Sequence, residues 1–265
     1  MRSRRRPRPL PADGWAPGPP SPVDALDDDD LAVVNRLLPW QCFTADADGR
    51  RLGDRAWAGK REEPQALPDP RITRMDERWR LAGRSVLEVG CFEGVHTIAL
   101  AWAGASVVGL DARVENVAKT AVRCALYGVA PMLHVRDLDR PDALAGIDAE
   151  LAHHVGVLYH LADPVGHLLE LGRHVSHGVM LDTHVATEGT ATYEVAGRSW
   201  AYQPYHEGGR ADVFSGMRNE ARWLPLPTLV EALDAAGFAS VEVVEERDER
   251  NGPRVLLFGE RRAAT

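Results

Sequence analysis

A glycine-containing turn with one carboxylate lies between an apolar segment at 85–89 and an apolar helical pattern at 95–102. The turn and its approach consist of Glu88, Val89, Gly90, Cys91, Phe92, Glu93 and Gly94. Glycines let a ligand come close to the backbone, and the N-terminus of the following helix presents N–H groups that no helical carbonyl accepts. A strand, a glycine turn and a helix in this order therefore predict a nucleotide-binding site.

A nicotinamide dinucleotide is the first alternative ligand for such a turn. Its fingerprint places glycine at three positions, G-x-G-x-x-G. Counted from Gly90, the second position holds Phe92 and the third holds Val95. Two of the three glycines are missing, which disfavours a pyrophosphate-binding loop.

The turn instead resembles the first motif of the class I S-adenosylmethionine-dependent methyltransferases, an acid-x-Gly-x-Gly-x-Gly pattern. Phe92 stands at the position of the middle glycine. The resemblance implies that Glu88 stands near the methionyl ammonium of the cofactor. It also implies that the loop lines the cofactor with Gly90, Cys91, Phe92 and Gly94.

Two further carboxylates follow the next expected strands. Asp111 lies 21 residues after Gly90 and, with Ala112, ends the second strand, where a carboxylate can accept both ribose hydroxyls. An aspartate there is also a common helix cap. The resemblance implies that Asp137 pairs with the adenine amino group and that Leu138 flanks the ring, although Asp137 alone could equally be a turn residue.

The segment Val155–Leu161 narrows the resemblance. Its Gly-Val-Leu-Tyr-His core is similar to a block of the methyltransferase subgroup that contains the bacterial tRNA wobble-uridine carboxymethyltransferases. Similar blocks occur at 38–43, 217–225 and 231–238, so the resemblance covers roughly residues 37–260. We therefore add Val155 and Tyr159 to the expected cofactor contacts.

One block departs from that subgroup. In the tRNA enzymes the Pro-Trp pair is followed by Arg-Lys, and the lysine helps hold the extra carboxylate of carboxy-S-adenosylmethionine. Here Gln41 and Cys42 follow Trp40, whereas the counterparts of two other contacts remain as Tyr159 and Arg218. We therefore expect ordinary S-adenosylmethionine as the cofactor and S-adenosylhomocysteine as its product.

Three histidines near strand ends are candidates for a general base, in the order His160, His154 and His184. Histidine titrates near neutral pH, which suits proton removal from an acceptor. Each could instead be a packed structural residue. A second possibility, a magnesium site built from Asp182, His184, Asp137 and Asp139, lacks a fixed ligand spacing, and we expect no metal.

The segment 187–223 is an insertion between the fifth strand and the next helix. Long insertions over a site often carry substrate contacts. The candidates are Trp200, Tyr202, Tyr205, Arg210 and Arg218, which could wall a planar acceptor or hold its carboxylate or phosphate. The alternative for the aromatic residues is a small accessory core.

Composition bounds the partners. The 265-residue chain has 45% hydrophobic residues, three cysteines and a net charge of −8. That charge disfavours nucleic acid, so we expect a small-molecule acceptor, with a tRNA-modifying enzyme and a non-catalytic cofactor-binding protein as alternatives. No apolar run suits a membrane, and the few cysteines fit a cytoplasmic protein. The oligomeric state stays open between monomer and homodimer.

Alternating strand and helix patterns from 85 to 258 predict an α/β fold. We expect a Rossmann-like, doubly wound and mainly parallel seven-stranded sheet with helices on both faces and an N-terminal extension. The last two strands could pair antiparallel across Asn251-Gly252. Expected domains are a disordered basic tail at 1–22, a helical and irregular lid at 23–80 and a methyltransferase domain at 81–265 with the insertion at 187–223.

Overall fold

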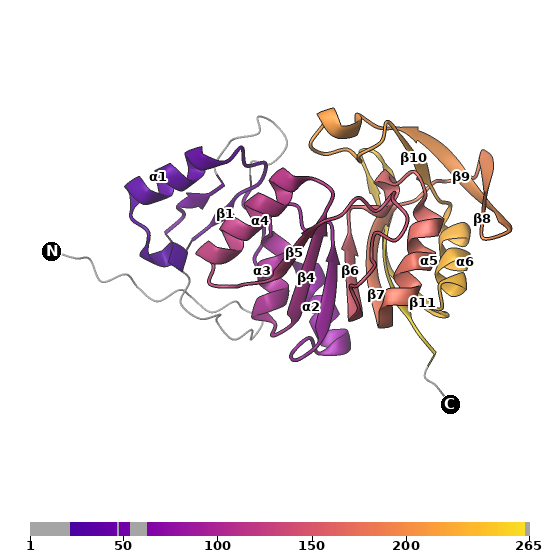
Figure 1. Ribbon diagram of the computed structural model, residues 1–265, viewed down its shortest axis with the longest axis horizontal. Coiled ribbons are helices and arrows are strands. Elements are labelled where there is room, and N and C mark those ends of the chain that lie inside the picture. Colours follow the sequence, from indigo (N-terminus) through magenta and orange to yellow (C-terminus); the bar gives the residue numbers. More distant parts are fainter. Residues whose placement is uncertain (1–21, 47, 54–62, 263–265) are drawn as a thin grey trace. The chain divides into compact units, whose positions relative to one another are not determined.

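The computed structural model describes residues 22–46, 48–53 and 63–262 (Figure 1). The chain divides into two compact units. The first unit comprises 1–83, 91–106 and 115–131, and the second comprises 84–90, 107–114 and 132–265. The basic tail expected at 1–22 lies outside the described residues up to residue 21.

The second unit contains a seven-stranded sheet with the order β11-β12-β7-β6-β3-β4-β5. Its strands are β3 (Ser85–Val89), β4 (Ser106–Asp111), β5 (Met132–Val135), β6 (Ala149–Val155), β7 (Val175–His184), β11 (Ser240–Glu249) and β12 (Gly252–Glu260). Only Ser106, the first residue of β4, is assigned to the first unit. The pairs β3–β6, β6–β7 and β4–β5 are parallel. This arrangement confirms the expected mainly parallel sheet.

The last two strands form the antiparallel hairpin that Asn251-Gly252 suggested. β12 pairs antiparallel with both β11 and β7, so the sheet is mixed at this edge. Gly252 has φ +130, a conformation that L side chains rarely adopt, which explains a glycine at this turn. β6 ends at Val155, because Gly156 turns the chain with φ +75.

The second unit has its apolar core between the sheet and two helices, α5 (Pro164–His174) and α6 (Leu226–Ala235), which lie side by side (Figure 1). Asp163 caps α5 by accepting the Gly166 N–H, and proline occupies the first turn of each helix, where its missing N–H costs nothing. Both helices contribute buried aliphatic residues, among them Val165, Leu168, Leu229 and Leu233.

The insertion folds into a three-stranded antiparallel sheet rather than a loop. Its strands are β8 (Ala191–Val195), β9 (Arg198–His206) and β10 (Glu220–Trp223), in the order β10-β9-β8. A short 3-10 helix, η3 (Gly209–Ala211), follows β9. Trp200 is 2% exposed and packs in the main apolar core of this unit rather than in a separate accessory core.

The first unit contains helices from both sides of the cofactor loop. They are η1 (Pro22–Ala25), α1 (Asp28–Leu37), α2 (Pro70–Trp79), α3 (Val95–Trp102) and nearly all of α4 (Val114–Leu126), beside the short pair β1 (Thr44–Ala45) and β2 (Arg51–Leu52). None of the helices within the described ranges is long and apolar enough to cross a membrane.

Asp27 caps α1 by accepting the Asp30 N–H, and residues 22–25 form a separate 3-10 turn before it. Within the lid expected at 23–80, residues 70–79 form the second helix, α2. Its signal was present in the sequence, since Asp69 is the N-cap and Pro70 the first helical residue.

A buried carboxylate connects the cofactor loop of the first unit to residues 41–42. Glu93 is fully buried, and one of its oxygens accepts from the Gln41 N–H and from Lys119 Nζ, each at 2.8 Å. The other oxygen accepts from the Cys42 N–H at 3.0 Å and lies 3.5 Å from Arg123 Nη2. One carboxylate thus holds two buried cations and the segment after Trp40.

Arg123 extends this network. Its guanidinium donates to the carbonyl oxygen of Cys42 at 2.9 Å and to the Thr44 hydroxyl at 3.3 Å, and it lies 4.7 Å from the centre of the Trp40 ring. The Arg123 side chain has no exposed surface, so these bonds take the place of the hydrogen bonds that its guanidinium would make to water. The network therefore fixes the N-terminal segment against α4.

A second buried polar pair lies in the other unit. His154 on β6 and His167 on α5 are both buried, and their Nε2 atoms are 3.0 Å apart. Burial lowers the pKa of His167 from 6.5 to about 4. Burial, and then the neighbouring His167, lowers the pKa of His154 well below 6.5. Both rings are therefore neutral in the folded protein at neutral pH.

We expect the free energy of unfolding to fall as the pH is lowered from 6.5 towards 4. In that window the unfolded chain takes up protons at these two positions and the folded chain does not, so each histidine costs about 1.4 kcal/mol per pH unit. Denaturant titrations of the wild type and of His154→Gln/His167→Gln at a series of pH values measure this. A variant as pH-sensitive as the wild type would contradict it, and replacing the exposed His206 by Gln serves as the control.

Replacing Glu93 by Gln should lower the free energy of unfolding by about 3 kcal/mol or more, because two buried cations lose their carboxylate. Adding Lys119→Met to that variant should restore part of the loss. The matched control is Glu150→Gln, whose 2.7 Å pair with Arg84 has both side chains over a third exposed, and whose loss should stay under about 1 kcal/mol. If Glu93→Gln and Glu150→Gln lowered the free energy of unfolding equally, the larger contribution proposed for Glu93 would be ruled out.

Candidate functional site

Every second residue of the cofactor loop has a left-handed backbone conformation. Gly90, Phe92 and Gly94 have φ angles of +79, +48 and +82, and α3 begins directly after them at Val95. Phe92 therefore adopts a left-handed conformation that glycine would adopt without steric cost. For a residue other than glycine this conformation costs about 1–2 kcal/mol, a strain that folded proteins retain mostly at functional positions.

Close packing explains why the other two loop positions are glycine. A Cβ at Gly90 would lie 2.3 Å from Cγ2 of Val157, within the second unit. A Cβ at Gly94 would lie 3.1 Å from the backbone of Thr120, within the first unit. The Gly90 N–H donates to the Leu110 carbonyl at 2.9 Å, which ties the start of the loop to β4.

The expected ribose and adenine residues lie at adjacent strand ends. Asp111 ends β4, its register partner is Val135 at the end of β5, and Asp137 follows two residues later. One Asp111 oxygen accepts the Arg113 N–H at 2.9 Å, and Ala112 between them is half-buried. Leu138 is 8% exposed and packs into the core beneath this edge.

The remaining expected contacts come from β3 and β6. Glu88 is 1% exposed, and its register partner on β6 is His153. Val155 ends β6, the Gly156 N–H donates to the Asp182 carbonyl, and Tyr159 follows in the short helix η2 (Leu158–His160). Within the second unit, the carboxyl ends of β3 to β6 therefore bring together Glu88, Gly90, Asp111, Asp137, Val155 and Tyr159.

His160 is hydrogen-bonded to a carboxylate from the insertion. Its Nδ1 lies 2.8 Å from Oε1 of Glu207, which follows β9 and whose side chain is only 3% exposed. Because a carboxylate accepts, Nδ1 carries the proton, and the Nε2 lone pair remains available to take another. A base oriented by an acid is the usual arrangement for proton removal.

Sequence patterns did not identify Glu207. It stands 47 residues from His160 in a Glu-Gly-Gly stretch that has no recognisable motif. Its second oxygen accepts the Gly216 N–H at 3.3 Å. Only the folding of the insertion brings this carboxylate to η2.

The other two histidine candidates have different surroundings. His154 is fully buried beside His167, where an acceptor has no access. His184, 4% exposed, donates from Nδ1 to the Pro253 carbonyl at 3.1 Å, and burial lowers its pKa. Its ring stacks on Trp223 at 5.0 Å and 8°. These contacts favour a structural role for both histidines.

Trp223 is the centre of an aromatic column. Tyr205 stacks on it at 4.3 Å and 14°, and Tyr159 meets both His184 and Trp223 edge-on. Tyr159 also lies 4.1 Å from the His160 ring. The column therefore runs from the insertion to the candidate base.

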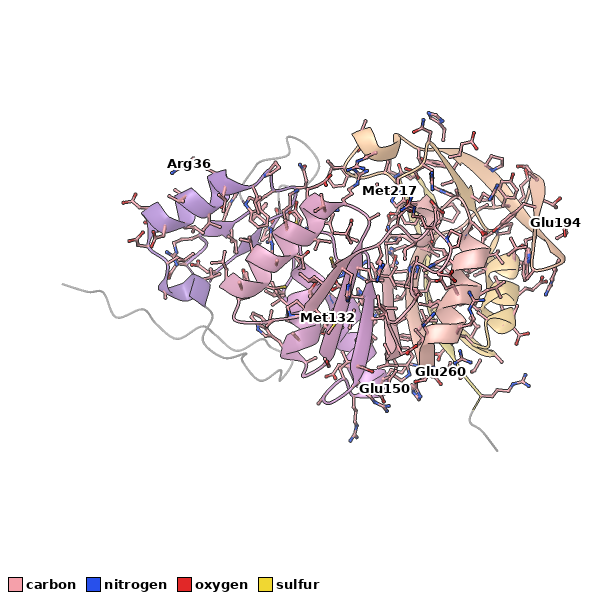
Figure 2. The ribbon with its side chains drawn as sticks, in the orientation of Figure 1. Arg36, Met132, Glu150, Glu194, Met217 and Glu260 are labelled. Carbon is pink, nitrogen blue, oxygen red and sulfur yellow. The ribbon has the colours of Figure 1, made fainter. Side chains whose placement is uncertain are left out.

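The other expected substrate residues are scattered. Tyr202 meets Tyr193 edge-on at 5.2 Å, and Arg210 is exposed while its carbonyl accepts from Arg113. Arg218 is half-exposed and lies 3.8 Å from Asp137. Figure 2 shows Met217, its neighbour, at the opposite end of the second unit from Glu150 and Glu260. Arg218 thus lies near the expected adenine position.

Asp182, a member of the alternative metal site, is held by arginines instead. It is fully buried at the end of β7 and bonds both Arg247, at 2.9 and 3.1 Å, and Arg254. The four residues of that alternative, which are Asp137, Asp139, Asp182 and His184, form no candidate ligand group within the described part of the chain. The two guanidinium groups give Asp182 a structural role.

Sequence comparison finds one curated relative. No model of a known protein family matches the chain. Over 169 residues the chain is 33% identical to the tRNA U34 carboxymethyltransferase of Marinobacter nauticus, a match that covers 62% of this chain and 47% of that protein. The chain thus spans about half the length of the curated relative that it matches.

Solved structures with a similar fold include chains determined with S-adenosylmethionine or S-adenosylhomocysteine. The N-terminal domain of EvdMO1, determined in the presence of S-adenosylhomocysteine and D-fucose, is 25% identical with a TM-score of 0.74, over 89% of this chain and 98% of that one. The magnesium protoporphyrin IX methyltransferase of Synechocystis PCC 6803, with bound S-adenosylmethionine, is 17% identical with a TM-score of 0.51, over 72% and 76%. The chain has the Rossmann-like fold of the S-adenosylmethionine-dependent methyltransferases, which confirms the resemblance seen in its motifs.

Proposed function

We propose that the protein transfers a methyl group from S-adenosylmethionine to a hydroxyl group of a small-molecule acceptor. The observation that carries this proposal is the bond between His160 and Glu207 at the carboxyl edge of the sheet. A neutral imidazole held by a buried carboxylate can remove the proton from a hydroxyl as the methyl group arrives. An oriented base of this kind favours an enzyme over a non-catalytic cofactor-binding protein.

The cofactor contributes the electrophilic methyl group on its sulfonium. Asp111 would accept the ribose hydroxyls and Asp137 the adenine amino group. Methyl transfer is an in-line displacement, so the main task of the protein is alignment. His160 would then take the acceptor proton on Nε2, and Glu207 would stabilise the imidazolium that forms.

The aromatic column favours an acceptor with a ring. Two members of the column come from the insertion, the half-buried Tyr205 and the buried Trp223, and their rings stack. Such surfaces suit a planar ring or the apolar face of a sugar. The similar EvdMO1 domain was determined with D-fucose present, so we propose a sugar-like, hydroxyl-bearing acceptor and D-fucose as the first compound to test.

A tRNA-modifying carboxymethyltransferase is the second candidate, and the Marinobacter relative favours it. Two observations weigh against it. The net charge of −8 is a poor match to a phosphate backbone. At the position of the cofactor-holding lysine of that subgroup, the backbone N–H groups of Gln41 and Cys42 bind Glu93, and neither side chain carries a charge.

Replacing His160 by Ala should lower kcat by about a hundredfold or more, because positioned bases contribute at least that much. Glu207→Gln should lower kcat by about tenfold while S-adenosylhomocysteine affinity stays unchanged, since the amide still orients the ring but no longer stabilises its charge. Turnover with labelled S-adenosylmethionine and D-fucose, followed by other small hydroxyl compounds, measures this. The exposed His206→Ala is the control, and full activity of His160→Ala would refute the role of this base.

Calorimetric titration should show S-adenosylmethionine binding at least as tightly as carboxy-S-adenosylmethionine, because no charged side chain follows Trp40. Asp111→Ala should weaken S-adenosylmethionine binding by about tenfold, the equivalent of one hydrogen bond to a charged group. A clear preference for the carboxylated cofactor would instead support the tRNA-modifying candidate.

A further inference from the structure

Arg113 is a buried arginine that the proposed chemistry does not use. It is 4% exposed and lies two residues after the expected ribose-binding Asp111. Its guanidinium donates to four backbone carbonyls of one loop: Arg210 at 2.7 Å, Asp212 at 2.8 Å, Gly209 at 3.1 Å and Ser215 at 3.2 Å. A planar group with five donors suits several carbonyls at once, which a lysine could not match.

The loop held by Arg113 also contacts the candidate base. Glu207 at its start bonds His160 through one oxygen and the Gly216 N–H through the other. Gly216 at its end packs so closely that a Cβ there would lie 2.3 Å from the carbonyl oxygen of His160. Both ends of loop 207–216 therefore contact His160, and Arg113 binds the residues between them.

The other end of Arg113 reaches the expected cofactor site. Its backbone N–H donates to Oδ1 of Asp111 at 2.9 Å, the carboxylate that would accept the ribose hydroxyls. A continuous set of hydrogen bonds thus runs from Asp111 through Arg113 to loop 207–216 and then to His160. Every residue of this set lies in the second unit.

We propose that Arg113 is a positioning residue that couples cofactor binding at Asp111 to the order of loop 207–216, and through Glu207 to the orientation of His160. This rests on the proposed function, because it assumes that Asp111 binds the ribose. Ribose bonds to Asp111 restrict the turn that carries Arg113, and the guanidinium passes that restriction to four carbonyls of the loop. Cofactor binding then increases the fraction of molecules in which Glu207 holds His160 in this orientation.

Hydrogen–deuterium exchange of the whole chain, with and without S-adenosylhomocysteine, tests this coupling without an acceptor. In the wild type the ligand should slow amide exchange in loop 207–216 by about tenfold, and in Arg113→Met by less than about twofold. Affinity for S-adenosylhomocysteine, measured by calorimetry, should change by less than about threefold. Arg113→Lys should recover part of the ligand-dependent slowing of exchange in loop 207–216. If Arg113→Met does not fold, Arg113→Lys is the variant compared with the wild type.

The matched control is Arg261→Met, which removes an arginine–carbonyl bond of 2.7 Å to Val175 at the start of β7 and should leave the loop response intact. An unchanged response in Arg113→Met, or a wild-type loop that does not respond to bound ligand, would overturn the coupling. If the wild type binds no S-adenosylhomocysteine, the proposed function fails first. Calorimetry therefore separates the two failures.

Discussion

The hydrogen bond between Glu207 and His160 joins the insertion to the short helix that follows β6. His160 belongs to a short helix after a parallel strand, whereas Glu207 follows an antiparallel strand of the insertion. The carboxylate is nearly buried, so it exchanges water for the imidazole and for the Gly216 N–H. The fold of the insertion, the closeness of Gly216 and the bonds of Arg113 all serve to keep that carboxylate in place.

The parallel sheet explains why the other site residues meet. Parallel strands end at the same edge, so residues that follow each strand lie close together however far apart they are in sequence. Asp111, Asp137 and Tyr159 obey this rule. Asp182 obeys it as well, but Arg247 and Arg254 from the terminal hairpin neutralise it. A carboxylate at this edge is therefore available to a ligand only where no neighbouring strand supplies a cation.

The loop between β3 and α3 shows how a motif can be kept while one of its residues changes. Phe92 stands at the position of the motif's middle glycine and has a left-handed backbone conformation, which a residue other than glycine adopts at a modest energetic cost. Glu93, the next residue, is committed to a buried network with Lys119 and Arg123 rather than to solvent. In the tRNA-enzyme subgroup that this chain resembles, Arg-Lys follows the Pro-Trp pair. Here the corresponding backbone binds this glutamate.

The sequence by itself determined the order of strands and helices, the parallel core, the terminal hairpin and the cofactor loop, because each has a local signal in apolar periodicity, glycine or turn residues. It also contained a local signal for the start of α2, because Asp69-Pro70 is a typical N-cap followed by a first helical proline. Only the tertiary structure decided that Glu207 orients His160, that His154 and Trp200 belong to the interior, and that Arg113 binds the insertion. Those contacts span 13 to 102 residues and depend on burial and side-chain direction, which no local pattern encodes.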